Sequence, residues 1–576
     1  MNLKRIIILL FLTNGMLSIG QITYEYDTLS MDRKMLGATD SVDYNTADLP
    51  TTFDGGRSIL SQDGLSINRF ANDYRGFRFR ASSEWQKMQF SALPYIGFSY
   101  SVGGQSSQYL KVKYAQAFSD SLLFNLGYER SNGLGFIRNT AFATNHIQIQ
   151  LEWKTRNYAM QFHAAYKNDS SAHAGGLLSD SLVIPLGLEF APIRKANASS
   201  NSQFGKLALN NYINFNPNTD GKFGLLTKHT YEITNKRYHE VDTIFGIYNM
   251  VNIDSATTFD RYTLASITNE AGLYFTKKHS YFDGRIGHRY WSFGNMGNEY
   301  DTTEIDLRST SRWQFGKLSF MNEFHFNLIG GFNAFSDKFS ASLTTNRWRG
   351  NGTISFENTA PVPVKRSYFA NNYDYLQTSI SLQQTLRAQT SIDYTFADDT
   401  TRIGAAFEYL QMNNVYLFDD TTWNPTSTGI NALQLGVNGN FQLGKWHFQP
   451  TVKYTVQSQG YLPAVQGYLR CYLKSYVFKA KKLLLVLGVD ASYTTGFNHR
   501  VYTPSMDAYT WYQSSGEIGA LANLHAFTAI EVSTFRFFVR YENIGSFWSN
   551  KVEQEVSGYP IAGTRFRIGI TWDFFN

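Results

Sequence analysis

Apolar and polar residues alternate one by one along many short segments between residues 91 and 576. A period of two residues is that of a β-strand, in which successive side chains point to opposite sides. The same alternation recurs in Lys445–Gln457, Thr534–Glu542 and Thr564–Phe574. In His146–Lys154, one face carries Ile147, Ile149, Leu151 and Trp153, and the other carries Gln148, Gln150, Glu152 and Lys154. The chain is therefore predicted to be all-β.

The chemistry of the two strand faces separates two kinds of β protein. A soluble sandwich also alternates, because one face of each strand is buried in a core. Here the polar faces carry many long charged side chains, and the apolar faces end in aromatic residues. That combination is typical of a transmembrane barrel, with a wet lumen and aromatic girdles at the two lipid interfaces. We favour the membrane barrel over a secreted all-β protein.

Composition excludes other classes of protein. Aromatic residues make up 16% of the chain, whereas a disordered chain is poor in them. The longest apolar runs, Ile6–Leu12 and Leu483–Leu487, are far shorter than the roughly 20 residues that a spanning helix needs. A disulfide scaffold is excluded, because Cys471 is the single cysteine.

Clusters of Gly, Asn, Asp, Ser and Thr divide the alternating region into strands. Ten short turns, one of them expected at Arg349–Gly352, alternate with eleven connections that are mostly longer. This pattern predicts an antiparallel barrel of about 22 strands, with a range of 16–22, short periplasmic turns and long extracellular loops. An even strand number with both ends on the short-turn side is usual for single-chain bacterial barrels.

The N-terminus reads as an export signal. Lys4 and Arg5 precede the apolar run Ile6–Leu12, and Ser18–Gly20 offers a small-residue cleavage site. We therefore predict a signal peptide over residues 1–20, cleaved after Gly20, and export to the outer membrane of a Gram-negative cell. Residues 21–90, which are polar and rich in Asp, are predicted to form a periplasmic extension, and residues 91–576 the barrel.

Several segments carry a family resemblance. They are Phe98–Gly104, Gln108–Val112, Asn125–Gly135, Gly175-Gly176, Gly558–Pro560, Arg565–Gly569 and Trp572–Phe575. From about Asn68 to Asn576 the chain resembles the "putative porin" family of Bacteroidota outer-membrane barrels. The resemblance implies an integral outer-membrane protein and, by the family's name, a pore. The aromatic end of Thr564–Phe574 also resembles the strand by which the barrel assembly machinery recognises its clients.

Motifs for catalysis or metal binding do not emerge. The eleven histidines are scattered, and no H-E-x-x-H, Gly-x-Ser-x-Gly or phosphate-binding glycine loop is present in the sequence. Asp398–Thr401 and Asp419–Thr422 resemble calcium ligands, but Asp and Thr in such clusters are more often turn residues. We expect no enzymatic activity, no cofactor and no metal site.

Basic residues gather on the polar faces of the last strands. They would line one wall of the lumen and favour anions there, unless they are simply part of a generic wet wall. The candidate lumen-lining residues are Arg470, Lys474, Arg536, Arg540, Glu542, Arg565 and Arg567.

A barrel of about 16 or more strands encloses a wide aqueous lumen, and we expect a part of the chain to narrow it. The longest connection, Asn168–Phe204, has an apolar centre interrupted by a proline, which is unfavourable on an exposed loop. It is expected to fold over or into the lumen, with residues 21–90 as a second candidate obstruction; the alternatives are a solvent-side hairpin or a partner contact. The candidate constriction residues are Leu182, Ile184, Pro185, Leu188 and Phe190.

The sequence thus predicts a porin-like outer-membrane channel for passive diffusion of small polar solutes. The alternative is a non-transporting barrel that serves as a surface receptor, as a scaffold, or as the partner of a secretion or assembly complex. The expected partners are outer-membrane lipid, small solutes and the barrel assembly machinery. No nucleic acid is expected, and the oligomeric state is left open.

Overall fold

The computed structural model describes residues 27–28, 88–216, 221–241, 248, 250–297, 299–398, 400–419, 421–498, 500–511, 517–547, 552–561 and 563–575. The predicted signal peptide lies outside the described residues, as does nearly all of the predicted extension over residues 21–90. Two short strands are described within residues 21–90, where β1 (Asp27–Thr28) pairs in parallel with β2 (Gln89–Phe90).

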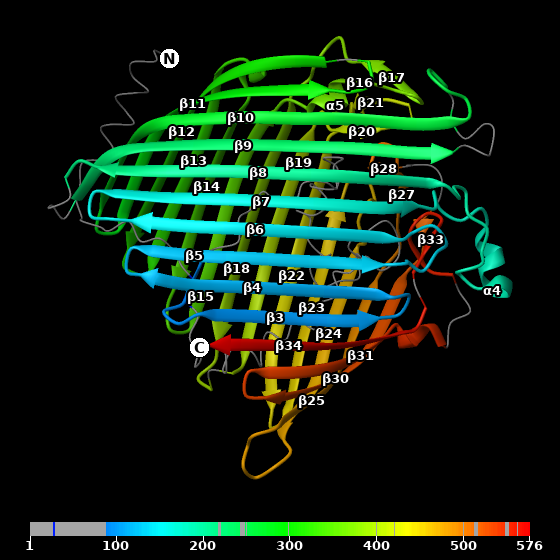
Figure 1. Cartoon of the computed structure of the whole chain (residues 1–576). Helices are drawn as coiled ribbons and strands as arrows, with labels where there is room; N and C mark the ends of the chain where they lie inside the picture. The colour runs from blue at the N-terminus through cyan, green and yellow to red at the C-terminus, as the bar shows by residue number, and fades with distance from the viewer. Residues whose placement is uncertain are drawn as a thin grey trace.

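The described strands form one closed antiparallel barrel of 22 strands, which confirms the predicted fold class. Figure 1 shows the first strands side by side across the front of the barrel. The first half consists of β3 (Tyr95–Gly103), β4 (Ser107–Ser119), β5 (Leu122–Gly133), β6 (Phe142–Lys154), β7 (Tyr158–His173), β8 (Ala198–Asn214), β9 (Gly221–Val241), β10 (Thr257–Lys277), β11 (Ser280–Gly294), β12 (Glu299–Phe315) and β13 (Leu318–Ile329).

The second half returns to the first strand and closes the ring. β34 pairs with β3, from Tyr95 opposite Phe575 to Gly103 opposite Arg567, so no unpaired barrel edge remains between them. The strands are β14 (Phe335–Thr344), β15 (Trp348–Thr359), β18 (Gln383–Thr395), β19 (Arg402–Asn413), β22 (Ile430–Leu443), β23 (Trp446–Gln457), β24 (Val465–Tyr476), β25 (Leu484–Thr494), β30 (Leu521–Val532), β31 (Phe535–Glu542) and β34 (Arg565–Phe575).

Short turns and longer loops alternate between these strands, and the last strand ends at the short-turn side (Figure 1). One predicted turn was wrong: Arg349–Gly352 lies inside β15, and the chain reverses just before it, between Thr344 and Trp348. There the Thr345 hydroxyl accepts the backbone N–H groups of Arg347 and Trp348, at 3.3 and 2.8 Å. The turn is therefore formed around a threonine and not at the two nearby glycines, Gly350 and Gly352.

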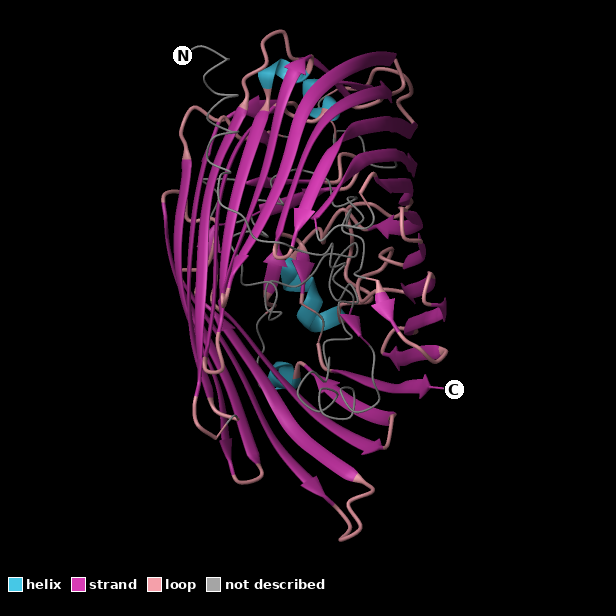
Figure 2. Cartoon of the chain, turned by 90° about the vertical axis from the view of Figure 1, so that its left-hand side faces the viewer, coloured by secondary structure: helices cyan, strands magenta, loops and turns pink. Residues whose placement is uncertain are grey.

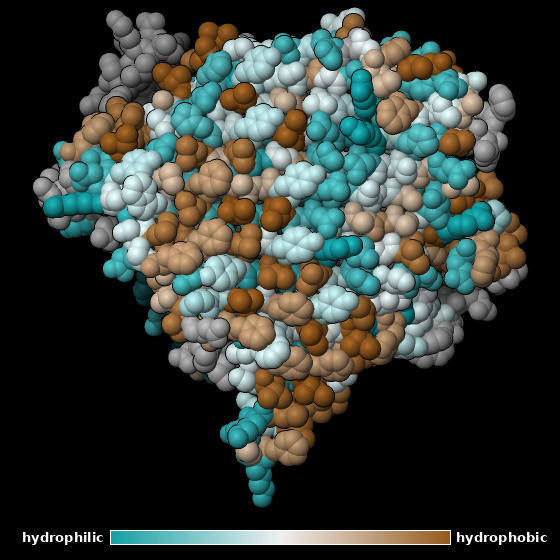
Figure 3. Space-filling view, viewed as in Figure 1, coloured by the Kyte–Doolittle hydropathy of each residue, from teal (hydrophilic) through white to brown (hydrophobic). Residues whose placement is uncertain are grey.

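The strand faces are assigned as the alternation predicted. In β6, Ile147 and Trp153 are 38% and 44% exposed on the outer face, whereas Gln150 is 4% exposed and points inward. In β34, Phe566 is exposed and Arg567 is buried. Figure 3 shows apolar residues gathered on the outer surface over the front strands, where lipid would contact them.

Short helices and strands follow the extracellular ends of the barrel strands, and Figure 2 shows some of them inside the outline of the ring of strands. No helix in the described part of the chain is long and apolar enough to cross a membrane. The short elements used below are η2 (Asp180–Leu182), α4 (Val183–Leu186), η3 (Gly331–Asn333), α5 (Pro363–Arg366), β16 (Ser367–Ala370), β17 (Tyr373–Leu376), β20 (Tyr416–Phe418), β21 (Trp423–Pro425), β27 (Arg500–Thr503), β28 (Ala508–Trp511), β32 (Gln554–Val556) and β33 (Tyr559–Pro560).

Candidate functional site

Five of the predicted lumen residues form one charged cluster on the inner wall of the last strands. Asp490 of β25 is fully buried and accepts hydrogen bonds from Arg470 Nε at 2.7 Å and from Arg540 Nη1 at 3.0 Å. Glu542 contacts Arg540 Nε at 3.6 Å and Arg567 Nε at 3.2 Å, and it also pairs with Arg565. We call this set the arginine cluster: Arg470, Asp490, Arg540, Glu542, Arg565 and Arg567.

The arginine cluster holds more positive than negative charge. Four guanidinium groups share two carboxylates, which leaves a surplus of two positive charges among its members. The two other predicted lumen residues lie toward the periplasmic end. Arg536 Nε pairs with Glu531 Oε1 at 2.8 Å, and Lys474 stands opposite Val486 in the β24–β25 pairing.

A second charged cluster lies on the inner wall of β10–β12, far from the first along the ring of strands. Arg308 contacts Glu270 Oε1 at 2.6 Å and Asp306 Oδ2 at 2.8 Å. Arg285 pairs with Glu270 and contacts Asp283 Oδ1 at 2.6 Å. Sequence reasoning missed this cluster, although the alternation of β10–β12 already places its members on polar faces.

The predicted constriction loop lies at the extracellular mouth. Because β7 and β8 extend into it, the connection spans residues 174–197 only, and Figure 1 shows α4 beyond the ends of the strands. Ile184 and Pro185 belong to α4; Leu182 is exposed, Phe190 is 67% exposed, and Leu188 is half-buried.

The base of this loop is its buried part. Leu177 and Ile193 pack with Tyr502 of β27 and with Tyr559 of β33. The Leu177 N–H donates to Gly558 O at 2.8 Å, and Gly176, which lies against the Gly558 backbone, has a φ of +89° that side-chain-bearing residues rarely adopt. These partners belong to the extracellular connections between β25 and β30 and between β31 and β34, well around the ring from β7 and β8, so the loop reaches over the mouth rather than down the lumen. Its role as a constriction stays a prediction.

A larger apolar cluster lies at another part of the mouth. Its members come from the wall strands β10 and β11 and from three extracellular loops, 360–382, 414–429 and 495–520. All are buried, although they belong to segments far apart along the ring. We call it the mouth cluster: Tyr262, Trp291, Phe293, Val364, Tyr368, Ala370, Tyr373, Tyr375, Tyr416, Phe418, Trp423, Met506 and Ala508.

Hydrogen bonds join the loops of the mouth cluster to each other and to the wall. The hydroxyls of Tyr373 and Ser505 lie 2.9 Å apart and connect two of the loops. The Asn371 N–H donates to Asp260 Oδ1 of β10 at 2.8 Å, and Asn252 donates to Ala370 O at 2.9 Å. The β16–β17 hairpin is therefore fixed from three sides.

The buried tyrosine hydroxyls of the mouth cluster are uncharged. Burial, as the largest effect, raises the pKa of Tyr368 and of Tyr375 well above the ordinary value, so both hydroxyls remain protonated. The Tyr375 hydroxyl donates to Val364 O at 2.6 Å. Lys365, which is also buried, places Nζ 4.3 Å from the centre of the Trp423 ring and 3.3 Å from Tyr416 O.

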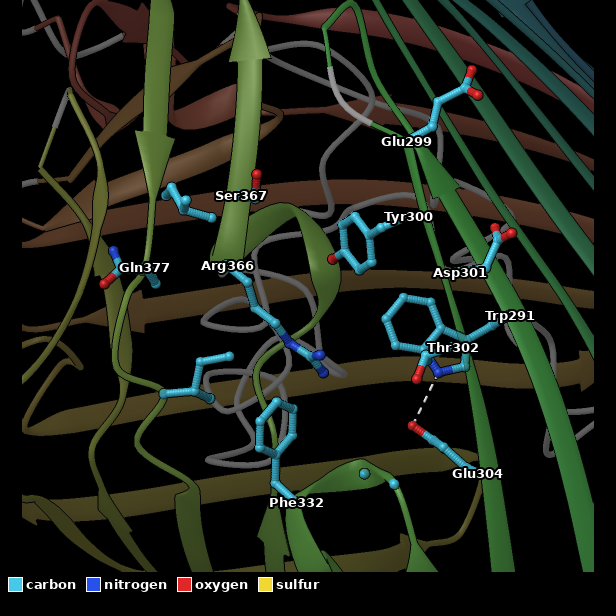
Figure 4. Close-up of a pocket in the computed structure, with 14 residues that line it drawn as sticks. Trp291, Glu299, Tyr300, Asp301, Thr302, Glu304, Phe332, Arg366, Ser367 and Gln377 are labelled. Atoms are coloured by element: carbon cyan, nitrogen blue, oxygen red, sulfur yellow. Dashed lines mark hydrogen bonds between the residues drawn. The ribbon is translucent and has the colours of Figure 1, made fainter.

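A cavity of about 790 Å³ opens beside the mouth cluster (Figure 4). Trp291, Tyr300 and Glu304 form one wall, and Phe332 of η3, Arg366 of α5 and Gln377 lie across from them. Burial lowers the pKa of Arg366 from its ordinary value, while Tyr300 and Glu304 act in the opposite direction. No sequence motif pointed to this cavity.

The two Asp-Thr segments act as turns. Asp398 accepts hydrogen bonds from the backbone N–H and hydroxyl of Thr401, at 3.0 and 2.6 Å, and Asp419 makes the same kind of contacts with Thr421 and Thr422. The two segments lie at opposite ends of β19, at a periplasmic turn and in an extracellular loop.

Solved outer-membrane receptors share this fold. The ferric enterobactin receptor of Pseudomonas aeruginosa, in a mutant form, aligns over 85% of this chain and 81% of its own, with 9% identity and a TM-score of 0.59. The pyoverdine receptor of P. aeruginosa, bound to pyoverdine, aligns over 85% and 80%, with 10% identity and a TM-score of 0.58. The ferric-catecholate import receptor of E. coli K12 aligns over 84% and 82%, with 10% identity and a TM-score of 0.57.

At these identities the likeness concerns the fold alone. No protein with a curated description matches the sequence. The sequence model of the family described as "Putative porin" matches residues 89–576, which include every barrel strand. The chain, an outer-membrane β-barrel in fold, therefore belongs to the "Putative porin" family.

Proposed function

We propose that this protein passes small polar solutes across the outer membrane through a lumen whose extracellular mouth is closed at rest. Membership of the "Putative porin" family and the charged inner wall support passage of polar solutes. The observation that carries the closed mouth is the mouth cluster, in which three loops and two wall strands bury their side chains together.

The size of the mouth cluster favours a channel that opens over one that is permanently open. Burying a large apolar side chain is worth about 1.5–3 kcal/mol, so exposing only three of them would cost about 5–9 kcal/mol. Because each 1.4 kcal/mol is a factor of ten, fewer than about one molecule in a thousand would then be open spontaneously. Binding of a solute or of a partner must supply the free energy that exposes these side chains.

The second candidate function is a surface receptor that does not conduct. Its supporting observation is the cavity beside the mouth cluster, which is lined by residues of β11 and β12 and of the extracellular connections that follow β13 and β15. Its fold neighbours include proteins described as a pyoverdine receptor and an import receptor. Both candidate functions use the same closed mouth and differ in whether solute crosses the lumen.

Swelling of proteoliposomes in sugar solutions tests the proposal. The informative variant replaces the β16–β17 hairpin, Ser367–Leu376, by two glycines, and the control deletes Lys479–Lys482 at a periplasmic turn. We expect slow swelling of wild type and of the control, and fast swelling of the hairpin deletion. Fast swelling of wild type would indicate a permanently open porin. Slow swelling of a correctly folded hairpin deletion would favour the receptor.

A further inference from the structure

The cavity beside the mouth cluster has the size and lining of a small-molecule site. Its volume of about 790 Å³ lies within the range of roughly 300–1,000 Å³ that is usual for ligand pockets. It combines three aromatic rings with a few polar groups that converge on the same space, as Figure 4 shows. The aromatic residues are Trp291, Tyr300 and Phe332.

The guanidinium of Arg366 is the central polar group. Its Nε donates to Pro361 O at 2.6 Å, which fixes the side chain and leaves both Nη groups directed into the cavity (Figure 4). The guanidinium lies 5.0 Å from the centre of the Phe332 ring and 5.4 Å from that of Trp291. Among the described residues, no carboxylate comes within ion-pair distance of Arg366. This cation therefore makes no direct ion pair in that part of the chain, and only the more distant charge of Glu304 across the cavity partly offsets it.

Two more polar groups are available on the opposite wall. Glu304 is buried and fixed by a 3.0 Å hydrogen bond from Trp291 Nε1 to one of its oxygens. The Tyr300 hydroxyl is buried and has no hydrogen-bond partner among the described residues. A buried hydroxyl without a partner is unfavourable, and a ligand with hydroxyl groups would satisfy it.

We propose that this cavity binds a small solute that carries an oxyanion, a carboxylate or a phosphate, on a ring bearing hydroxyl groups. The paired Nη groups of Arg366 match the two oxygens of such an anion. The ring packs against the aromatic side chains, and its hydroxyls bond to Glu304 and Tyr300. That the bound solute is also the transported one rests on the proposed function, whereas binding itself does not.

Isothermal titration calorimetry of the purified full-length barrel in detergent tests the site. The probes are glucuronate for a carboxylate, glucose 6-phosphate for a phosphate, and glucose as the uncharged control. We expect at least one of the two anions to bind at least tenfold more tightly than glucose, and the stronger of them identifies the source of the oxyanion. If neither anion binds more tightly than glucose, the inference is overturned.

Variants tie the binding to the cavity. Arg366→Gln should weaken anion binding at least tenfold, whereas Arg347→Gln, at a periplasmic turn, should leave it unchanged. Phe332→Ala removes a half-exposed ring whose loss should not impair folding, and it should weaken binding of the same anion. Unchanged binding in folded Arg366→Gln or in Phe332→Ala would refute the assignment. Intact binding together with absent transport in the liposome assay would contradict the proposed function and leave the site in place.

Discussion

Replacing Asp490 by Asn tests how the arginine cluster stabilises the barrel. Asp490 is fully buried, and its two oxygens accept hydrogen bonds from both Arg470 and Arg540. Asn has nearly the same shape but no charge. The substitution therefore leaves two buried guanidinium groups with less compensating charge and creates no cavity.

The expected loss is about 3 kcal/mol of unfolding free energy. Breaking a buried ion pair by removing one partner costs about 3–5 kcal/mol, because the other charge stays buried without compensation. The lower end applies, because Arg540 keeps its contact with Glu542 at 3.6 Å and the Asn oxygen still accepts one hydrogen bond. The rings of Tyr468 and Phe527 lie 6.0 and 5.7 Å from the Arg470 guanidinium and do not replace the negative charge that it loses.

Reversible unfolding in urea, followed by tryptophan fluorescence in lipid vesicles, measures this loss. The matched control is Asp393→Asn, in which a half-exposed carboxylate loses a 3.9 Å contact with Arg402 and should cost less than about 1 kcal/mol. Adding Arg470→Met to Asp490→Asn should recover part of the stability, since it removes one uncompensated charge. Equal losses in Asp490→Asn and Asp393→Asn would refute the reasoning.

Three further predictions follow from the strand faces, the lumen charge and one turn. Ile149→Arg, on the lipid side in the middle of β6, should cost about 2–4 kcal/mol in vesicle unfolding, while Ile149→Val should be nearly neutral; equal stability of the two variants would show that the face is misassigned. The surplus positive charge of the arginine cluster should give anion selectivity in the reversal potential of the hairpin-deleted channel, and Asp490→Asn should increase it; a cation preference would remove this expectation. Hydrogen bonds from Thr401, the largest effect, lower the pKa of Asp398 to about 2. Its contribution to stability should therefore be present above about pH 4 and lost as pH falls toward 2, so the difference in urea midpoint between wild type and Asp398→Asn should shrink over that interval and nowhere else.

The barrel and its faces could be predicted from the sequence, because both depend on local periodicity. Ile147 and Gln150 are assigned to opposite faces by counting alone, and clusters of turn residues give the number of strands. The error at Arg349–Gly352 has a local cause as well. Gly350 and Gly352 looked like a turn, whereas the hydroxyl of Thr345 makes the actual one.

The candidate site could be predicted only in part, because it depends on register and on loop packing. The basic residues of the last strands were identified on the polar faces, but the pairing of Arg470 with Asp490 follows from the strand register. The mouth cluster and the cavity at Arg366 combine a few strand residues with loop segments that are far apart in sequence and carry no periodic pattern. Neither leaves a local signal.

The proposal that loops close the extracellular mouth is tested most directly by single-channel conductance in a planar bilayer. Wild type should show no steady conductance at low voltage and only brief openings, whereas the variant lacking Ser367–Leu376 should show a stable open level. Steady conductance of wild type at the same level as the deletion variant would contradict the closed mouth, because it would mean that the mouth cluster does not obstruct the lumen.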